Sequence, residues 1–154
     1  MNLQHYPILL VEDNSSDVIL TKHALKKAKL LNPVQVAKDG EMAVDYLSGI
    51  EPYNNRDKYP LPVMILLDLH LPAKSGLEVL AWLRQQPTLK DLPVVVLSAS
   101  NRANDVNRAY DLGISSYVIK PVAFDALLKV MRYLNQYWIL LNQPPPEVQQ
   151  TDDR

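Results

Sequence analysis

Four short apolar segments of the sequence each end on polar residues that can take part in phosphoryl chemistry. Apolar segments of this length are typical of buried strands in a parallel sheet, and ligands bind outside the carboxyl ends of such strands. We therefore expect three carboxylates, a hydroxyl and an ammonium group to meet at one edge of a sheet. The residues are Glu12 and Asp13 after residues 8–11, Asp68 after residues 63–67, Ser98 after residues 94–97, and Lys120 after residues 117–119.

This set of side chains suits a divalent metal and a phosphoryl group. Glu12 and Asp13, facing Asp68, offer the hard oxygen ligands that Mg²⁺ prefers. A carboxylate can itself attack phosphorus to form an aspartyl phosphate, and such a transfer needs mainly positioning and neutralisation of the transferred oxygens. Lys120 can supply a fixed positive charge, and Ser98 can donate a hydrogen bond to the new phosphoryl group. Each residue alone has an ordinary explanation, such as a solvated turn, so the prediction depends on the whole set.

The elements that would position these residues alternate five times between strand and helix. This pattern predicts an α/β fold, a doubly wound five-stranded parallel sheet with helices on both faces and right-handed crossovers. Asn14 can cap the first helix with Asp17 at its third position, and because capping accounts for Asp17 we leave it out of the site. The other predicted helix starts are Asp39, Ser75 and Asn101, and a fifth helix begins after Pro121. The predicted ends are near Leu31 and at Gly49, Pro87 and Gly113.

Length and composition predict one domain. The chain has 154 residues, of which 47% are hydrophobic and 21% charged, enough for one well-packed core. We expect this domain over residues 1–143, with an extended C-terminal helix, and a flexible Pro-rich polar tail over residues 144–154. The polar segment 51–60 is longer than the usual connection between a helix and a strand, and the sequence does not reveal its role.

Charge and cysteine content exclude several classes of function. The formal net charge is −1 with scattered Lys and Arg residues, so neither nucleic acid nor an anionic membrane is expected as a partner. The absence of cysteine excludes disulfides, thiolate catalysis and Cys-ligated metal sites. The N-terminal residues lack the pattern of a secretory leader, and we expect a cytoplasmic protein.

Four motifs carry a resemblance to a known family, the receiver domains of two-component response regulators. In order along the chain they are Leu10-Val11-Glu12-Asp13, Leu66-Leu67-Asp68-Leu69-His70-Leu71-Pro72 followed by Ser75-Gly76, Val96-Leu97-Ser98-Ala99, and Tyr117-Val118-Ile119-Lys120-Pro121. The resemblance implies the flavodoxin-like (βα)5 receiver fold and a protein that is a phosphoacceptor rather than an enzyme acting on other substrates. It also implies a role for each matched residue: Asp68 the phosphoacceptor, Glu12 and Asp13 with the His70 carbonyl the further ligands of Mg²⁺, Ser98 and Tyr117 the switch pair, Lys120 the phosphoryl-binding lysine, and Pro121 a cis proline.

A closer resemblance is to the single-domain regulators of cyanobacterial phytochrome kinases. It rests on the insertion before Leu61-Pro62, on segment 87–93, and on residues 137–140 followed by prolines. It implies a sensor histidine kinase partner of the phytochrome type and signalling through contacts with a downstream protein that the sequence does not identify. Since only a helix and a tail follow Pro121, we expect no DNA-binding output domain.

The last predicted helix carries apolar residues at alternating steps of three and four. The spacing fits a core stripe, but its distal part extends beyond the last strand and would be exposed on a monomer. We therefore predict a homodimer through this helix, with an interface made of Phe124, Leu127, Met131, Leu134, Trp138 and Leu141.

Two other functions fit parts of the pattern. A haloacid-dehalogenase-type phosphatase also uses an aspartate nucleophile at a strand end, but His70 stands where its second Asp is expected. A flavodoxin-like flavin binder shares the topology but needs a phosphate-binding loop after the first strand. There, Glu12 and Asp13 would repel the phosphate.

Overall fold

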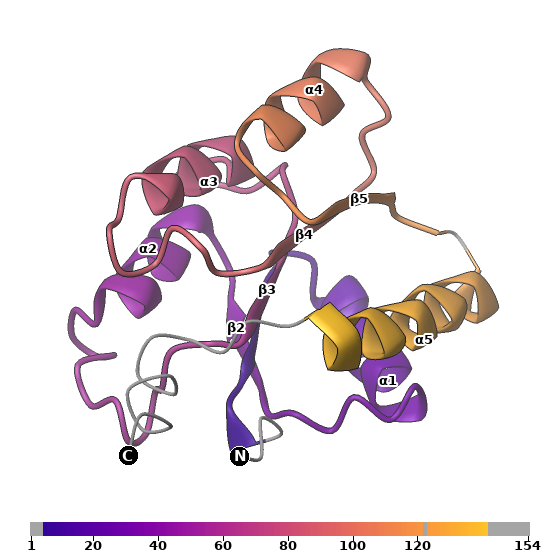
Figure 1. Ribbon diagram of the computed structural model, residues 1–154, viewed down its shortest axis with the longest axis horizontal. Coiled ribbons are helices and arrows are strands. Elements are labelled where there is room, and N and C mark those ends of the chain that lie inside the picture. Colours follow the sequence, from indigo (N-terminus) through magenta and orange to yellow (C-terminus); the bar gives the residue numbers. More distant parts are fainter. Residues whose placement is uncertain (1–4, 122, 142–154) are drawn as a thin grey trace.

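The computed structural model describes residues 5–121 and 123–141, with residues 138–141 described by their backbone alone. Strands and helices alternate throughout (Figure 1). In chain order they are β1 Ile8–Val11, α1 Ser15–Lys27, β2 Val34–Ala37, α2 Gly40–Ser48, β3 Met64–Leu67, α3 Gly76–Arg84, β4 Val94–Ser98, α4 Ala103–Asp111, β5 Ser116–Ile119 and α5 Phe124–Leu141. The predicted tail, residues 144–154, lies outside the described residues.

The five strands form one parallel sheet with the order β2-β1-β3-β4-β5. Helices α1 and α5 cover one face, and α2, α3 and α4 cover the other (Figure 1). Successive residues of β1 alternate between two cores, with Leu9 and Val11 facing α2 and α3 and Leu10 facing α1 and α5. Burial on both faces explains why the central strands are continuously apolar, and the predicted doubly wound fold is confirmed.

Helix caps set the positions of three helices. The side chains of Asn14, Asp39 and Ser75 accept hydrogen bonds from the backbone nitrogen three residues later, at 3.0, 2.7 and 3.2 Å. These are the predicted starts of α1, α2 and α3. The prediction was wrong at four other boundaries. Helix α1 ends at Lys27 instead of near Leu31, α3 ends at Arg84 instead of Pro87, and α4 has Arg102 as its N-cap instead of Asn101 and ends at Asp111 instead of Gly113.

The 51–60 segment packs on the C-terminal end of α2. The Arg56 guanidinium donates hydrogen bonds to the carbonyls of Tyr46, Leu47 and Tyr59 at 2.8, 2.9 and 3.1 Å. The Tyr53 ring packs against Tyr46 and Tyr59, with ring centroids 5.2 Å from each. The carbonyls of the last helical turn have no partner within a helix, and Arg56 satisfies two of them here.

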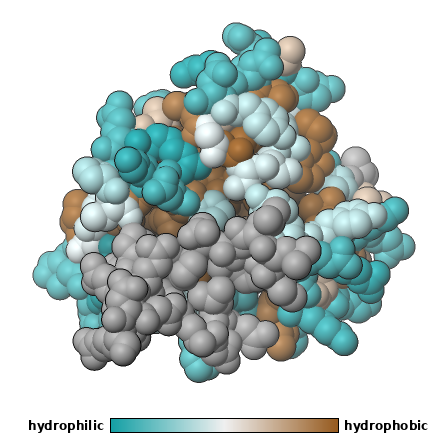
Figure 2. Space-filling view, viewed as in Figure 1, coloured by the Kyte–Doolittle hydropathy of each residue, from teal (hydrophilic) through white to brown (hydrophobic). Residues whose placement is uncertain are grey.

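Helices α4 and α5 differ strongly in how they contact the sheet. Of the nine residues of α4, only Ala109 is buried, and hydrophilic residues cover its visible face (Figure 2). In α5, Leu127, Met131 and Leu134 are buried in the core shared with α1. No described helix is both long and apolar enough to cross a membrane.

The burial of α5 corrects the predicted dimer interface. Leu127, Met131 and Leu134 pack inside the subunit, and Phe124 packs against the same core and against the His23 ring at 5.1 Å between centroids. Leu127, Met131 and Leu134 are therefore core residues, and Phe124 is partly buried against them. The prediction was wrong because the same spacing serves a core stripe and a helix seam. The side chains of Trp138 and Leu141 lie outside the described residues.

Candidate functional site

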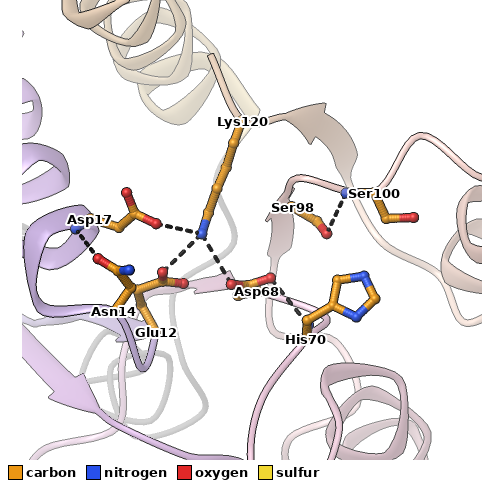
Figure 3. A network of polar contacts seen from close by, with 8 residues as sticks. All are labelled: Glu12, Asn14, Asp17, Asp68, His70, Ser98, Ser100 and Lys120. Carbon is orange, nitrogen blue, oxygen red and sulfur yellow. Dashed lines mark hydrogen bonds and ion pairs between the residues drawn. The ribbon is translucent and has the colours of Figure 1, made fainter. Parts of the chain in front are cut away.

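The site lies where β1, β3 and β5 end, and its centre is one lysine surrounded by acids (Figure 3). The Lys120 Nζ atom lies 2.8 Å from Glu12 Oε1, 2.9 Å from Asp17 Oδ2 and 3.0 Å from Asp68 Oδ2. Glu12 and Asp68 are buried, so hydrogen bonds from Lys120 replace those that water would make to an exposed side chain. The structure thus brings Glu12, Asp68 and Lys120 together at one edge, as the strand pattern predicts.

Three of the acids are placed to share a cation. Ligand oxygens of Glu12, Asp13 and Asp68 all lie within 4.8 Å of one another, with Asp13 exposed and the other two buried. An all-oxygen set with one open side fits Mg²⁺, which keeps several waters and takes one or two carboxylates. The backbone nitrogen of His70 donates to Asp68 Oδ1 at 3.2 Å, and this bond holds the predicted acceptor in place. The His70 carbonyl as a ligand stays a prediction.

Asp17 belongs to this cluster, contrary to the prediction from the sequence. Its backbone nitrogen is bound by the Asn14 side chain at 3.0 Å, as expected for a capped helix, while its carboxylate pairs with Lys120. The two roles use different atoms, so capping did not exclude the second. Asp17 joins the cluster because the Lys120 ammonium can donate to three acceptors, and Asp17 is the third beside Glu12 and Asp68.

The acidic site perturbs the pKa values of its members. Burial, reinforced by the neighbouring Asp68 carboxyl, raises the pKa of Glu12 to about 8, and the attraction of Lys120 only partly opposes this. Burial alone would lower the pKa of Lys120, but hydrogen bonds to Glu12, Asp17 and Asp68 raise it above its ordinary value. The raised pKa means that Glu12 keeps its proton to a higher pH than a free carboxylic acid does, and a bound cation must displace that proton.

Stability and metal affinity should respond to pH in opposite directions. Folding raises the pKa of Glu12 from 4.5 to about 8, so between these values the unfolded chain binds fewer protons than the native protein and stability falls as pH rises. Mg²⁺ affinity should rise over the same interval. Urea unfolding in EDTA from about pH 5 to pH 8 should show this slope in the parent and a flatter one in Glu12→Gln. Equal slopes would contradict the role of Glu12.

The predicted switch residues, Ser98 and Tyr117, both form hydrogen bonds to the backbone of Ser100. Ser98 is fully buried at the end of β4, and its Oγ accepts a hydrogen bond from Ser100 N at 3.2 Å. The Tyr117 hydroxyl donates to the Ser100 carbonyl at 2.8 Å. Ser98 and Tyr117 are thus connected through the backbone of Ser100.

The expected cis proline is not found. Among the described residues the cis peptide bond is Glu51–Pro52, and Lys120–Pro121 is not cis. The trans form is the default for an X-Pro bond, favoured by about 0.5–1 kcal/mol. This expectation came from the family resemblance and not from any residue neighbouring Pro121.

Comparison with known proteins agrees with this geometry. Residues 8–132 match the family model of the response regulator receiver domain. Response regulator Rcp1 from Synechocystis sp. is 38% identical over 132 residues, which cover 86% of this chain and 88% of Rcp1. The structure of the phosphorylated cyanobacterial phytochrome response regulator RcpA has a TM-score of 0.82 and 38% identity, covering 92% of this chain and 99% of RcpA. The Mn²⁺-bound form of Rcp1 gives a TM-score of 0.80 at 36% identity, covering 91% and 99%. The matched segment spans most of the chain, and this protein belongs to the response regulator receiver domain family.

Proposed function

We propose that Asp68 accepts a phosphoryl group from a sensor histidine kinase in a reaction that requires Mg²⁺. The observation that carries the proposal is the position of Asp68, which is 7% exposed, contacts the Lys120 ammonium and lies beside the acidic residues Glu12 and Asp13. The buried Asp68 carboxylate is paired with Lys120 and shares the candidate cation site with Glu12 and Asp13. Receiver domains accept phosphoryl groups from histidine kinases and bind a divalent metal at such an acidic pocket.

The transfer requires little of the protein beyond positioning and charge. An Asp68 oxygen forms a bond to phosphorus while the bond from phosphorus to the kinase histidine nitrogen breaks, and the released imidazole takes a proton from solvent. Mg²⁺, held by Glu12, Asp13 and Asp68, would neutralise charge on the transferred oxygens. Lys120 offers its N–H donors to the phosphoryl oxygens. Ser98 supplies a hydroxyl donor, and its departure from Ser100 N alters the surroundings of Tyr117.

The similar proteins indicate which kind of kinase serves as the partner. Rcp1 and RcpA are response regulators, and RcpA is a phytochrome response regulator, which supports a phytochrome-type kinase as the donor here. Output is then through a downstream protein, without direct DNA binding, and the exchange takes place in the cytoplasm. The haloacid-dehalogenase-type alternative has no support from the family or the relatives.

Removal of metal should abolish phosphorylation. With acetyl phosphate and Mg²⁺, the full chain should acquire phosphate that is labile in both acid and base, as an acyl phosphate is, and EDTA should prevent this because the acids would then repel the incoming oxygens. Transfer from a panel of phosphorylated kinases, phytochrome-type ones included, identifies the donor. Labelling that persists in EDTA would sink the proposed mechanism.

The protein should also form a homodimer through the far part of α5. Tyr133 and Tyr137 are 61% and 42% exposed on this helix, beside a cavity of about 310 Å³ against β5 lined by Val118, Val130 and Leu134, and the predicted contacts Trp138 and Leu141 follow on the same helix. Burying one large apolar side chain contributes about 1.5–3 kcal/mol. Sedimentation equilibrium should show a dimer for the parent and a weaker one for Trp138→Ala, Leu141→Ala. A parent that stays monomeric in both phosphorylation states would remove the dimer from the proposal.

A further inference from the structure

Ser100, in the connection from β4 to α4, makes hydrogen bonds in four directions. Its backbone nitrogen donates to Ser98 Oγ at 3.2 Å, and its carbonyl accepts from the Tyr117 hydroxyl at 2.8 Å. Its own hydroxyl donates to Asp105 Oδ2 at 2.6 Å and accepts from Arg102 N at 3.3 Å. Ser100 is itself buried, its bond to Ser98 is buried, and the other three bonds are partly buried. Figure 3 shows Ser100 beside Ser98, on the far side of Asp68 from Lys120.

The start of α4 is held by Ser100 and not by a cap of the usual kind. Arg102 occupies the N-cap position of α4 without a side-chain capping bond, whereas Ser100 reaches both Arg102 N and the Asp105 carboxylate in the first turn. A hydroxyl bound to an ionised carboxylate at 2.6 Å is a charge-assisted hydrogen bond, about twice as strong as a neutral one. The first turn of α4 should therefore follow any movement of Ser100.

We propose that the Ser100–Asp105 hydrogen bond transmits the phosphorylation state of Asp68 to α4, with Asp105 as the positioning residue. This rests on the proposed function of Asp68 and Ser98. When the Ser98 hydroxyl turns toward a phosphoryl group, Ser100 N loses its acceptor and the backbone at residue 100 shifts. Tyr117 follows through the Ser100 carbonyl, and α4 follows through Asp105. Energetic coupling between sites can be carried by a hydrogen-bond network with two arrangements, and the bonds of Ser100 to Ser98, Tyr117 and Asp105 form such a network.

A second contact joins α4 to β5 and offers an alternative route from Tyr117 to α4. The Tyr110 hydroxyl accepts a hydrogen bond from Tyr117 N at 3.3 Å, near the far end of α4. If this contact carried the signal, the end of α4 would respond and its first turn would not depend on Asp105. The two routes can therefore be separated along the helix.

The test compares the full chain with and without beryllofluoride and Mg²⁺, which together mimic the phosphoryl group. Amide hydrogen exchange of residues 103–111 reports on α4, ring resonances report on Tyr117, and acetyl phosphate labelling reports on Asp68. In Asp105→Ala the response of α4 should fall about fivefold, the lower end of typical coupling between sites, while labelling and the Tyr117 response stay as in the parent. Asp105→Asn should restore the response because its amide oxygen still accepts from Ser100. Asn107→Ala, at an exposed position of the same helix, is the matched control.

The outcomes distinguish the coupling from the site on which it rests. If α4 responds equally in the parent and in Asp105→Ala, the coupling is overturned while the phosphoryl site stands. If the parent itself does not respond, the proposed switch fails and the coupling with it. Should Asp105→Ala lose helix content by circular dichroism, Ser100→Ala replaces it and should show the same loss of response. Where both single variants fold, the double variant Ser100→Ala, Asp105→Ala should respond no more weakly than either single variant. Additive losses in the double variant would also overturn the coupling.

Discussion

Asp68→Asn is expected to accept no phosphate from acetyl phosphate or from a phosphorylated kinase. The amide has nearly the shape of the carboxylate, but it has no anionic oxygen with which to attack phosphorus. It should preserve the fold because the change removes one buried negative charge beside Glu12 and leaves Lys120 paired with Glu12 and Asp17. Labelling in Mg²⁺ followed by acid and base treatment, together with a melting curve, measures both effects.

The matched control for this variant is Asp57→Asn, at an exposed position outside the site. It should be labelled as the parent is. Undiminished labelling of Asp68→Asn would mean that another acid accepts the group, and Asp13, the exposed member of the acidic set, would be the first to test. Labelling lost from the control as well would show that the assay does not report on Asp68.

Gly76→Ala should strongly destabilise the protein. A Cβ atom at this position would lie 2.2 Å from the Asp68 carbonyl oxygen and 2.6 Å from Leu69 Cα. Both are backbone atoms, so the chain carrying Asp68 must move. We expect a loss of about 2–4 kcal/mol in the free energy of unfolding, at or above the usual range for overpacking, together with slower labelling of Asp68. Urea unfolding and acetyl phosphate kinetics measure the two.

Gly113→Ala separates this steric effect from backbone strain. Gly113 has a φ of +78°, but the nearest atom to an added Cβ is Arg84 Nε at 3.5 Å, so space is available. The expected loss is about 1–2 kcal/mol, from the left-handed backbone alone, with labelling unchanged. If Gly76→Ala matched the parent in stability and in rate, the close packing of α3 against the acceptor strand would be wrong.

The sequence predicts those features that depend on local pattern. Apolar strands buried on both faces stand out in the sequence, and the caps at Asn14, Asp39 and Ser75 act within one helical turn. The start of α4 was missed because the group that holds it, Ser100, lies outside the helix and before its N-cap. The cap residues alone therefore did not determine this boundary.

Contacts that depend on the folded chain were harder to predict. The ion pair of Asp17 with Lys120 joins residues 103 positions apart, and nothing in the spacing around Asp17 indicates it. The apolar stripe of α5 has the same period whether it covers a sheet or another subunit, so Leu127 and Met131 could not be assigned to the core until their burial was known. The site residues named by motif were easier, because strand ends of a parallel sheet meet at one edge.

Because α4 buries so few residues, the switch needs less free energy to move it than it would for a helix embedded in the core. A helix that buries one residue of nine should open locally at a small fraction of the global unfolding free energy, and its amides should exchange faster than those of α5. A shift in population from mostly one arrangement to mostly the other takes about 5.5 kcal/mol of differential binding. One phosphoryl group with a few charge-assisted hydrogen bonds can approach that value. Moving a helix such as α5, with Leu127, Met131 and Leu134 in the core, would take more.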